Sequence, residues 1–371
     1  MRSTPRPKQA AKHAMKNALK IGEIFDPRRK HKTWKFASQE HYIKDFLTAV
    51  PLLAEKFKAI RTELPEKLPN IGTTIGIEIE CENIAQLTTQ LVFPANWVYK
   101  TDGSLRNNGM EFISPANSVY EVLPSLALVL AWIHSGSPDF SWRTSVHVHI
   151  DCSSLTVEEF KRFIILYFLF EEALFQFANP ARKETNIFCT PITRCDFYAI
   201  SEFIHAPNDN PIALKNAFDV MSGRIKKYSA LNLGHMYDFG TVEFRHLRGT
   251  GDPKLFGTWL TILCSLYDAA KTLSSEELFQ YVKRLNTTSS YDEFTEHVFG
   301  DVKEHLLSPF SSFFLSRGVS LVKEVLYGGS LLKDSPKAPI TSGLAQFVRL
   351  AHKKNKSDRL QRKVTFTAVS T

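Results

Sequence analysis

Hydrophobic and polar residues alternate one by one along residues 71–83, which is typical of a β-strand with one buried face. Shorter runs rich in β-branched and aromatic residues predict further strands. They cover residues 97–100, 110–114, 144–151, 228–233 and 241–247. On each strand every second side chain points to the same side, so polar residues can gather on one face of a sheet.

Apolar residues recur at helical spacing between the predicted strands. This spacing predicts helices over residues 119–134, 156–177, 212–222 and 253–271. Residues 38–62 have the same spacing, but Pro51 should stop or kink that helix. Thr156 and Glu159 form the capping-box pattern that begins a helix. Residues 274–351 predict short helices and loops.

The sequence favours a cytoplasmic protein without a membrane span. The longest apolar run, residues 163–170, is far shorter than a bilayer crossing and has charged residues on both sides, so we expect a buried helix there. The first eight residues lack the apolar stretch of a secretory signal. The five cysteines show no CxxC spacing, and their odd number argues against a closed disulfide framework, which favours a reducing compartment.

The net charge of +8 is concentrated at the two ends of the chain. Residues 1–35 carry +9 and residues 352–371 carry +5, which leaves −6 for the body between them. An acidic body suits a site that collects divalent cations. The basic ends fit either solvated tails or segments that dock on an acidic surface or a nucleic acid.

Three carboxylates share one face of the first predicted strand. Alternation places Glu78, Glu80 and Glu82 on one side and isoleucines on the other. Like charges at neighbouring positions repel unless water screens them or a cation neutralises them. The simpler interpretation is the solvated outer face of an antiparallel sheet.

Three further strands repeat this arrangement of polar residues against an aliphatic side. Glu111 follows an Asp-Gly turn pair and lies between two apolar residues. His147, His149 and Asp151 alternate with aliphatic residues, a spacing that lets two imidazoles face a metal or a phosphate. The last of these strands places Glu243 and Arg245 on one face, as either a surface ion pair or a metal ligand beside a phosphate-binding guanidinium.

Several common motifs are absent from the sequence. No GxxxxGK[ST] and no GxGxxG after a strand is present, which argues against a P-loop and a dinucleotide-binding fold. The lack of HExxH and of paired CxxC makes a zinc enzyme less probable.

Taken in order, the spaced motifs resemble those of the amidoligase family, in the superfamily of glutamine synthetase and glutamate–cysteine ligase. The resemblance rests on GxExE, DGSL followed by GxEFxSP, HVHID, YxxLN and TVEFR, and it runs from about residue 71 to residue 249. It implies an α+β fold with a curved, mainly antiparallel sheet that forms a glutamine synthetase-like funnel flanked by helices. It also implies ATP and two or three Mg2+ or Mn2+ ions as cofactors.

Carried over position by position, the resemblance also assigns roles. The implied metal ligands are Glu78, Glu80, Glu111 and Glu243, with His147 or His149 near the metal or the phosphates. Arg245 would hold the γ-phosphate, and Tyr228 and Asn232 would contact phosphate or substrate. Glu78, Glu243 and Arg245 would form the catalytic set, and Glu82 and His246 stay outside the assignment.

The implied reaction joins a carboxylate, such as glutamate, to an amine through an acyl phosphate, with release of ADP and phosphate. The matching organisation is a basic flexible arm (1–37), a catalytic domain (38–271), its helical C-terminal part (272–351) and a basic tail (352–371). Two alternatives stay open: a non-catalytic nucleotide-binding or structural member of the fold, and a nucleic-acid-binding protein that acts through its tails.

Overall fold

Seven strands form one antiparallel sheet in the part of the chain that the structure describes. This structure is a computed structural model, which describes residues 18–25, 39–84, 91–94, 96–179, 188–192, 197–224, 228–307 and 311–328. The strands are β1 (Thr74–Cys81), β2 (Val98–Thr101), β3 (Met110–Ile113), β4 (Asn117–Ser118), β5 (Val146–Asp151), β6 (Leu231–Asn232) and β7 (Thr241–Phe244). Their order is β2-β3-β1-β5-β7-β6, and β4 pairs with β1 outside this path.

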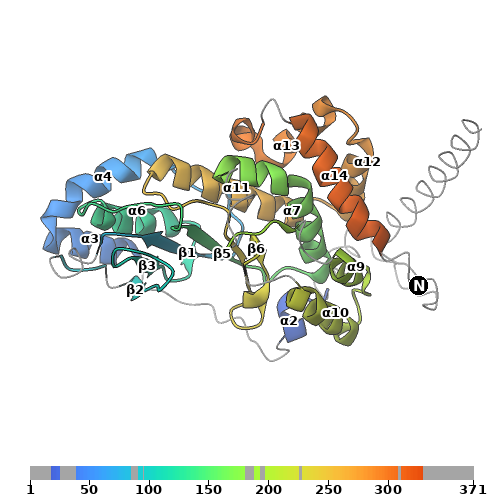
Figure 1. Cartoon of the computed structure of the whole chain (residues 1–371), viewed down its shortest axis with the longest axis horizontal. Helices are drawn as coiled ribbons and strands as arrows, with labels where there is room; N and C mark the ends of the chain where they lie inside the picture. The colour runs from blue at the N-terminus through green and yellow to red at the C-terminus, as the bar shows by residue number, and fades with distance from the viewer. Residues whose placement is uncertain are drawn as a thin grey trace, which may run out of the picture.

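Most helices lie above the sheet or to its right in the view of Figure 1. The described α-helices are α2 (Ile21–Phe25), α3 (Gln39–Ala49), α4 (Ala54–Glu63), α6 (Val122–Ile133), α7 (Val157–Ala178), α9 (Phe197–His205), α10 (Pro211–Arg224), α11 (Pro253–Thr272), α12 (Ser275–Arg284), α13 (Thr288–Phe299) and α14 (Ser311–Gly328). Short 3-10 helices are η1 (Pro51–Leu53), η3 (Gly234–Met236) and η4 (Gly300–His305). The expected α+β fold with an antiparallel sheet flanked by helices is confirmed.

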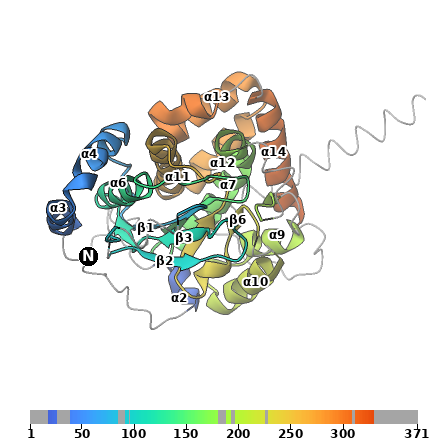
Figure 2. The same cartoon turned by 60° about the vertical axis from the view of Figure 1, so that its left-hand side comes forward.

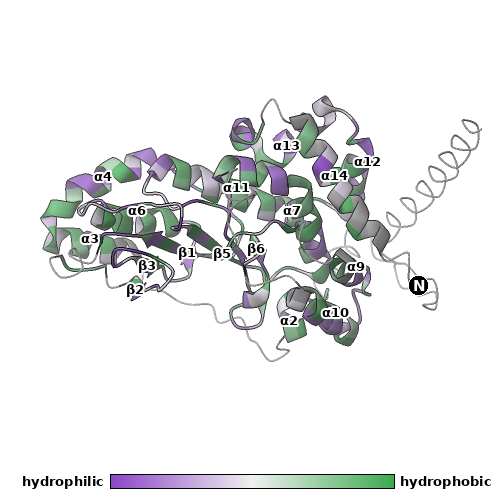
Figure 3. Cartoon of the chain, in the orientation of Figure 1, coloured by the Kyte–Doolittle hydropathy of each residue, from purple (hydrophilic) through white to green (hydrophobic). Residues whose placement is uncertain are grey.

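One face of the sheet packs against α6, α7 and α11. Phe112 of β3 contacts Trp132 of α6 with ring centroids 5.6 Å apart, and Phe244 of β7 contacts Phe163 of α7 at 6.1 Å. Phe163 in turn contacts Tyr267 of α11. These helices lie together on the same side of the sheet in Figure 2, and the hydrophobic colour dominates α6 and α7 in Figure 3. Burial of this apolar layer supplies the main driving force for folding.

The predicted elements between residues 38 and 272 are confirmed, with differences of a few residues at their ends. α3 ends at Ala49 and a 3-10 turn begins at Pro51, as proline requires. At the start of α7, Thr156 accepts a hydrogen bond from the Glu159 amide at 3.2 Å, and the Glu159 carboxylate accepts one from the Thr156 amide at 2.6 Å. The capping box is therefore present. The buried helix expected over residues 163–170 is part of α7.

Two regions differ from the sequence expectation. α14 runs for 18 residues, longer than the short helices expected there, because it packs along α7. Residues 18–25 lie inside the segment expected to be a flexible arm, but Ile21 is fully buried and its amide donates to the Leu155 carbonyl at 2.8 Å. Residues 1–17 and 329–371, with most of the basic ends, lie outside the described residues. Among the described helices, none has both the length and the apolar character that a membrane crossing requires.

Replacing Gly318 with alanine should destabilise the protein, because α14 lies very close to the backbone of α7 there. A Cβ atom at position 318 would lie 2.2 Å from the backbone oxygen of Leu169. This oxygen belongs to the backbone of α7 and cannot easily move away. Overpacking of this kind costs about 2 kcal/mol of unfolding free energy. Gly223, in α10, is the matched control: a Cβ there meets nothing within 4 Å, so alanine should stabilise by about 0.5–1 kcal/mol. Denaturant unfolding of both variants measures the difference, and equal stabilities would contradict the close packing.

Candidate functional site

Charged and polar side chains cross the sheet on the face opposite α6, α7 and α11. Direct partners on neighbouring antiparallel strands point to the same face, so the strand register determines which residues meet. The pairs are Lys100 with Glu111, Glu111 with Glu80, Glu78 with His147, His149 with Glu243, and Glu243 with Asn232. The structure therefore brings together the polar residues of the motifs on β1, β3, β5, β6 and β7.

Glu78 lies between two imidazoles at the centre of this face. Its Oε2 is 3.0 Å from His147 Nδ1, and its Oε1 is 3.3 Å from His149 Nε2. Burial alone would raise the pKa of Glu78, but the hydrogen bonds and charges of the two histidines outweigh burial and hold the pKa well below its usual range. Glu78 is therefore an anion at neutral pH, as a metal ligand must be.

The two carboxylate oxygens of Glu243 contact different partners. Oε1 lies 3.2 Å from His147 Nδ1 and also contacts the Arg245 guanidinium, while Oε2 lies 3.2 Å from His235 Nε2. Asn232 Nδ2 donates a further hydrogen bond to Oε2 at 2.7 Å. Burial would raise the pKa of Glu243, but the hydrogen bond from His235 and the nearby positive charges lower it. One buried carboxylate thus joins two histidines on separate elements.

A second set of contacts fixes the orientation of His147. Its Nε2 is 2.9 Å from Ser145 Oγ, and this hydroxyl donates to Glu80 Oε2 at 2.6 Å. The Ser145 amide donates to the same Glu80 oxygen at 2.8 Å. With Nε2 engaged on this side, Nδ1 faces Glu78 and Glu243. Hydrogen bonds behind a histidine commonly orient metal-ligating imidazoles in this way.

Glu111 extends the acidic group toward the edge strand β2. Lys100 Nζ lies 3.0 Å from Glu111 Oε2. Burial, together with the charge of Glu78 and a hydrogen bond to it, raises the pKa of Glu111 to about 7 despite the opposing charge of Lys100. Two neighbouring carboxylates that compete for one proton are a strong local source of negative potential, which a divalent cation would relieve.

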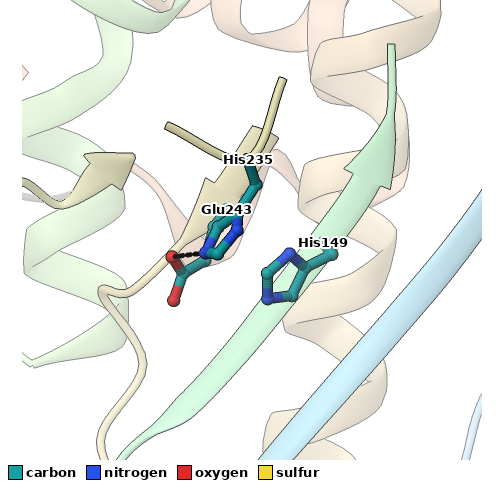
Figure 4. A group of neighbouring side chains, drawn as sticks. All are labelled: His149, His235 and Glu243. Atoms are coloured by element: carbon teal, nitrogen blue, oxygen red, sulfur yellow. Dashed lines mark ion pairs between the residues drawn. The ribbon is translucent and has the colours of Figure 1, made fainter. Parts of the chain in front are cut away.

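Among the residues that the structure describes, two groups of three side chains have the donor atoms and spacing to hold a metal ion. They are Glu78, His147 and Glu243, and His149, His235 and Glu243. In each group the potential ligand atoms lie within 4.8 Å of one another. Glu243 belongs to both groups, and Figure 4 shows the second. Carboxylate and imidazole donors on one buried face fit divalent cations, so the residues present suit the metal ions that the motifs imply.

Arg245 is held at the border of this face by the backbone of a neighbouring segment. Its Nε donates to the Phe188 carbonyl at 3.2 Å, and its guanidinium carbon lies 5.9 Å from the centre of the Tyr228 ring. Segment 188–192 is fixed in turn, because the Ile192 amide donates to the buried carboxylate of Glu171 at 2.7 Å. Arg245 and Tyr228 therefore lie next to each other beside Glu243, where the polar face is partly exposed to solvent.

Some polar residues of the motifs lie apart from this centre. Glu82 follows the last residue of β1, and its Oε1 accepts a hydrogen bond from the Arg106 amide at 2.7 Å. Asp151 Oδ1 accepts from the Ser153 amide at 2.8 Å. His246 is buried among aromatic side chains, with Nε2 3.1 Å from the Tyr167 hydroxyl. These three contacts organise loops and core.

Sequence reasoning missed three residues of the site: His235, Ser145 and Lys100. His235 lies on η3, in the connection from β6 to β7, where no strand alternation signals its direction. A usable signal was its position between Asn232 and Glu243, because a hairpin connection lies close to both of its strands. Ser145 and Lys100 become significant only once the register with Glu80 and Glu111 is known.

Comparison with known proteins gives one family match. The family model described as "Putative amidoligase enzyme" matches residues 84–264. The match includes His147, His149, Glu243 and Arg245, and it begins after β1 and therefore after Glu78. The resemblance to the amidoligase family is confirmed over this part of the chain, which supports an amide-bond-forming ligase in general.

More distant comparisons add little. The crystal structure of a bifunctional glutathione synthetase from Pasteurella multocida is similar with a TM-score of 0.33 and 9% sequence identity, covering 83% of this chain and 53% of that chain. The chain thus spans about half the length of that protein, and a likeness this distant carries no argument about function. A comparison with curated proteins gives no match.

Proposed function

We propose that the protein is an ATP- and Mg2+-dependent ligase that joins a carboxylate to an amine. The observation that carries the proposal is the position of Glu243, which belongs to two groups able to hold a cation and contacts Arg245. Divalent ions beside a guanidinium are the usual means of holding and activating the phosphates of ATP. The family match over residues 84–264 supports amide formation as the outcome.

Glu78, Glu111, Glu243 and His147 are the proposed ligands of the Mg2+ or Mn2+ ions, with His149 beside them. Glu80 would take part through Oε1, because its Oε2 already binds Ser145. These residues would hold ions whose positive charge offsets the negative charge on the transferred group. The residues themselves contribute a preorganised face, because Glu243 and His147 are almost fully buried and are held in place by hydrogen bonds with Asn232 and Ser145.

Arg245 is the proposed contact to the γ-phosphate. Its guanidinium already lies beside Glu243, and its planar fork matches two phosphate oxygens. Tyr228, which is 39% exposed, offers an aromatic face next to this guanidinium, and Asn232 holds Glu243 in place. We assign Tyr228 to substrate or phosphate contact and Asn232 to positioning of the metal carboxylate.

In the proposed reaction, a carboxylate oxygen of the substrate attacks the γ-phosphorus of ATP and the bond to the β-phosphate oxygen breaks. This step gives an acyl phosphate and ADP. The amine then attacks the acyl carbon, phosphate leaves with the former carboxylate oxygen, and the amine loses a proton. Phosphorylation is needed because oxide is a very poor leaving group, whereas phosphate leaves readily. Glutamate is the first carboxylate to test. The proposal also includes a sheet shaped like that of glutamine synthetase.

The proposal predicts release of ADP and phosphate that depends on both a carboxylate and an amine. The assay uses ATP, Mg2+ and glutamate with a panel of amines, and compares the intact chain with Glu78→Gln and Glu82→Gln. Turnover should fall about 10³-fold or more in Glu78→Gln, which loses a metal ligand, and should persist in Glu82→Gln, because an amide oxygen can still accept from the Arg106 amide. ATP binding without turnover for any pair of substrates would favour a non-catalytic nucleotide-binding protein instead.

A further inference from the structure

Two histidines and one carboxylate form a compact group at the β7 side of the site. Figure 4 shows the imidazole of His235 over the Glu243 carboxylate and the imidazole of His149 on the neighbouring strand. His235 Nε2 is 3.2 Å from Glu243 Oε2, and the two imidazole centroids are 5.0 Å apart. The potential ligand atoms of the three side chains lie within 4.8 Å of one another, so a small movement would bring all three to one ion.

A hydrogen bond to the neighbouring strand orients the imidazole of His149. His149 Nδ1 lies 3.3 Å from the Thr241 hydroxyl, which can accept the Nδ1 proton. The other nitrogen, Nε2, is buried and faces the Glu78 carboxylate, 3.3 Å from Oε1, without the alignment of a regular hydrogen bond. With the proton on Nδ1, Nε2 carries a lone pair that faces Glu78 Oε1, an arrangement that a bound cation would stabilise. A hydrogen bond behind the ring that fixes the tautomer is the usual arrangement of a metal-bound histidine.

His235 is placed by its own loop and not by the sheet. Asn232 Oδ1 accepts from the Gly234 amide at 2.9 Å while its Nδ2 donates to Glu243, so one side chain joins the loop to the carboxylate. The His235 carbonyl accepts from the amides of Phe239 and Gly240 at 2.9 and 3.1 Å. Gly240 has a φ of 75°, the left-handed conformation that closes this turn. The loop therefore holds the third ligand over the other two.

The chemistry of these donors differs from that of the group around Glu78. Mg2+ binds oxygen ligands and keeps several waters, whereas imidazole nitrogen suits Zn2+, Fe2+, Co2+ and similar ions. A group with two imidazoles and one carboxylate should therefore discriminate against Mg2+. The group built on Glu78 contains two carboxylates and one imidazole, which is nearer to the preference of Mg2+ or Mn2+.

We infer that His149, His235 and Glu243 form a separate site for a borderline transition-metal ion such as Zn2+, which binds there in preference to Mg2+ and in the absence of ATP. The inference rests on the proposed function and extends it, since Glu243 would bind this ion through Oε2 and a Mg2+ ion through Oε1. Its test does not depend on catalysis. Metal binding and ligase activity are measured separately. The experiments therefore distinguish a ligase that lacks this site from a Zn2+-binding protein that lacks ligase activity.

Co2+ is the probe, because its visible absorption reports nitrogen and oxygen ligands and it resembles Zn2+ in ligand preference. Metal-free full-length protein is titrated with Co2+ in millimolar Mg2+ and no nucleotide, and bound metal is counted after gel filtration. Wild type should retain one Co2+ per chain, which Zn2+ displaces. His235→Gln and His149→Gln should each weaken Co2+ binding at least about 100-fold. His41, which is exposed on α3, provides the control, and His41→Gln should bind as wild type does.

Two results would overturn the inference. One is Co2+ binding in His235→Gln and His149→Gln that equals wild type while both variants remain folded by circular dichroism. The other is loss of Co2+ from wild type in millimolar Mg2+, which would show that the group has no preference for the softer ion. His235 is 34% exposed in its side chain, so its replacement should leave the fold intact, and it is the decisive variant.

Discussion

Glu243→Gln should lower ATP turnover by about 10³-fold or more and should weaken binding of Mn2+, because the carboxylate serves both groups of potential metal ligands. Glutamine keeps the shape but removes the charge that His147, His235 and Arg245 now share. Electron paramagnetic resonance of Mn2+ measures binding without any substrate, and ADP release measures turnover. Both should fall together.

The matched control for this experiment is Glu82→Gln, since Glu82 is also buried but accepts a hydrogen bond from a loop amide outside both groups. Removal of one partner from a buried charge pair can cost about 3–5 kcal/mol of stability, so folding of Glu243→Gln must be checked by a thermal melt. Glu243→Asp, which keeps the charge, should retain more Mn2+ binding than the glutamine variant. Normal Mn2+ binding by folded Glu243→Gln would show that the ions bind elsewhere.

Arg245→Met should reduce kcat by about 10³-fold, with a smaller effect on the KM for ATP. The guanidinium lies at the edge of the polar face of the sheet, and in the proposed reaction it stabilises charge that builds up on the transferred phosphate. Methionine is of similar length and removes only the charge and the donors. Arg245→Lys restores the positive charge and should recover part of the rate. Recovery should be incomplete, because a single ammonium cannot bind two phosphate oxygens in a planar fork. Steady-state kinetics at saturating ATP separates kcat from KM.

Arg284→Met provides the comparison for this variant, since Arg284 is exposed on α12 and stacks on Tyr281. If Arg245→Met raised only the KM and left kcat unchanged, the arginine would bind ATP in its ground state without stabilising the transferred group. If neither constant changed, its only role would be the ion pair with Glu243 and the hydrogen bond to Phe188.

Strand alternation predicted which side chains share a face at the centre of the candidate site. Residues 71–83 indicated a strand with carboxylates on one face, and β1 places Glu78 on the polar face of the sheet. The same reasoning placed His147, His149 and Glu243 on that face, because side-chain direction along a strand follows from sequence alone. The position of Glu78 opposite His147 required the register, which alternation does not give.

The limit of alternation is visible at the end of β1. Glu82 has the same parity as Glu78, yet β1 ends at Cys81, and Asn83 takes a left-handed conformation with a φ of 60°. The chain leaves the ladder there, so Glu82 turns to the Arg106 amide. His235 shows the opposite case, since a loop residue outside every periodic pattern reaches the centre through backbone contacts of its turn.

Helix prediction failed where a helix depends on a distant partner. The pattern over residues 274–351 predicted short helices, but the 18-residue α14 is stabilised by its contact with α7, about 150 residues earlier in the chain. α9 was likewise not predicted. Packing between distant segments commonly overrides weak local preference in this way.

We propose above all that the polar face of the sheet is a site for ATP and divalent metal ions. Isothermal titration of ATP into the protein, once with Mg2+ and once with a chelator, tests it most directly. We expect ATP binding with Mg2+, little binding with the chelator, and little binding of either kind to Glu243→Gln. Equal affinity for ATP with and without metal, or unchanged Mg2+-ATP binding by Glu243→Gln, would contradict the claim.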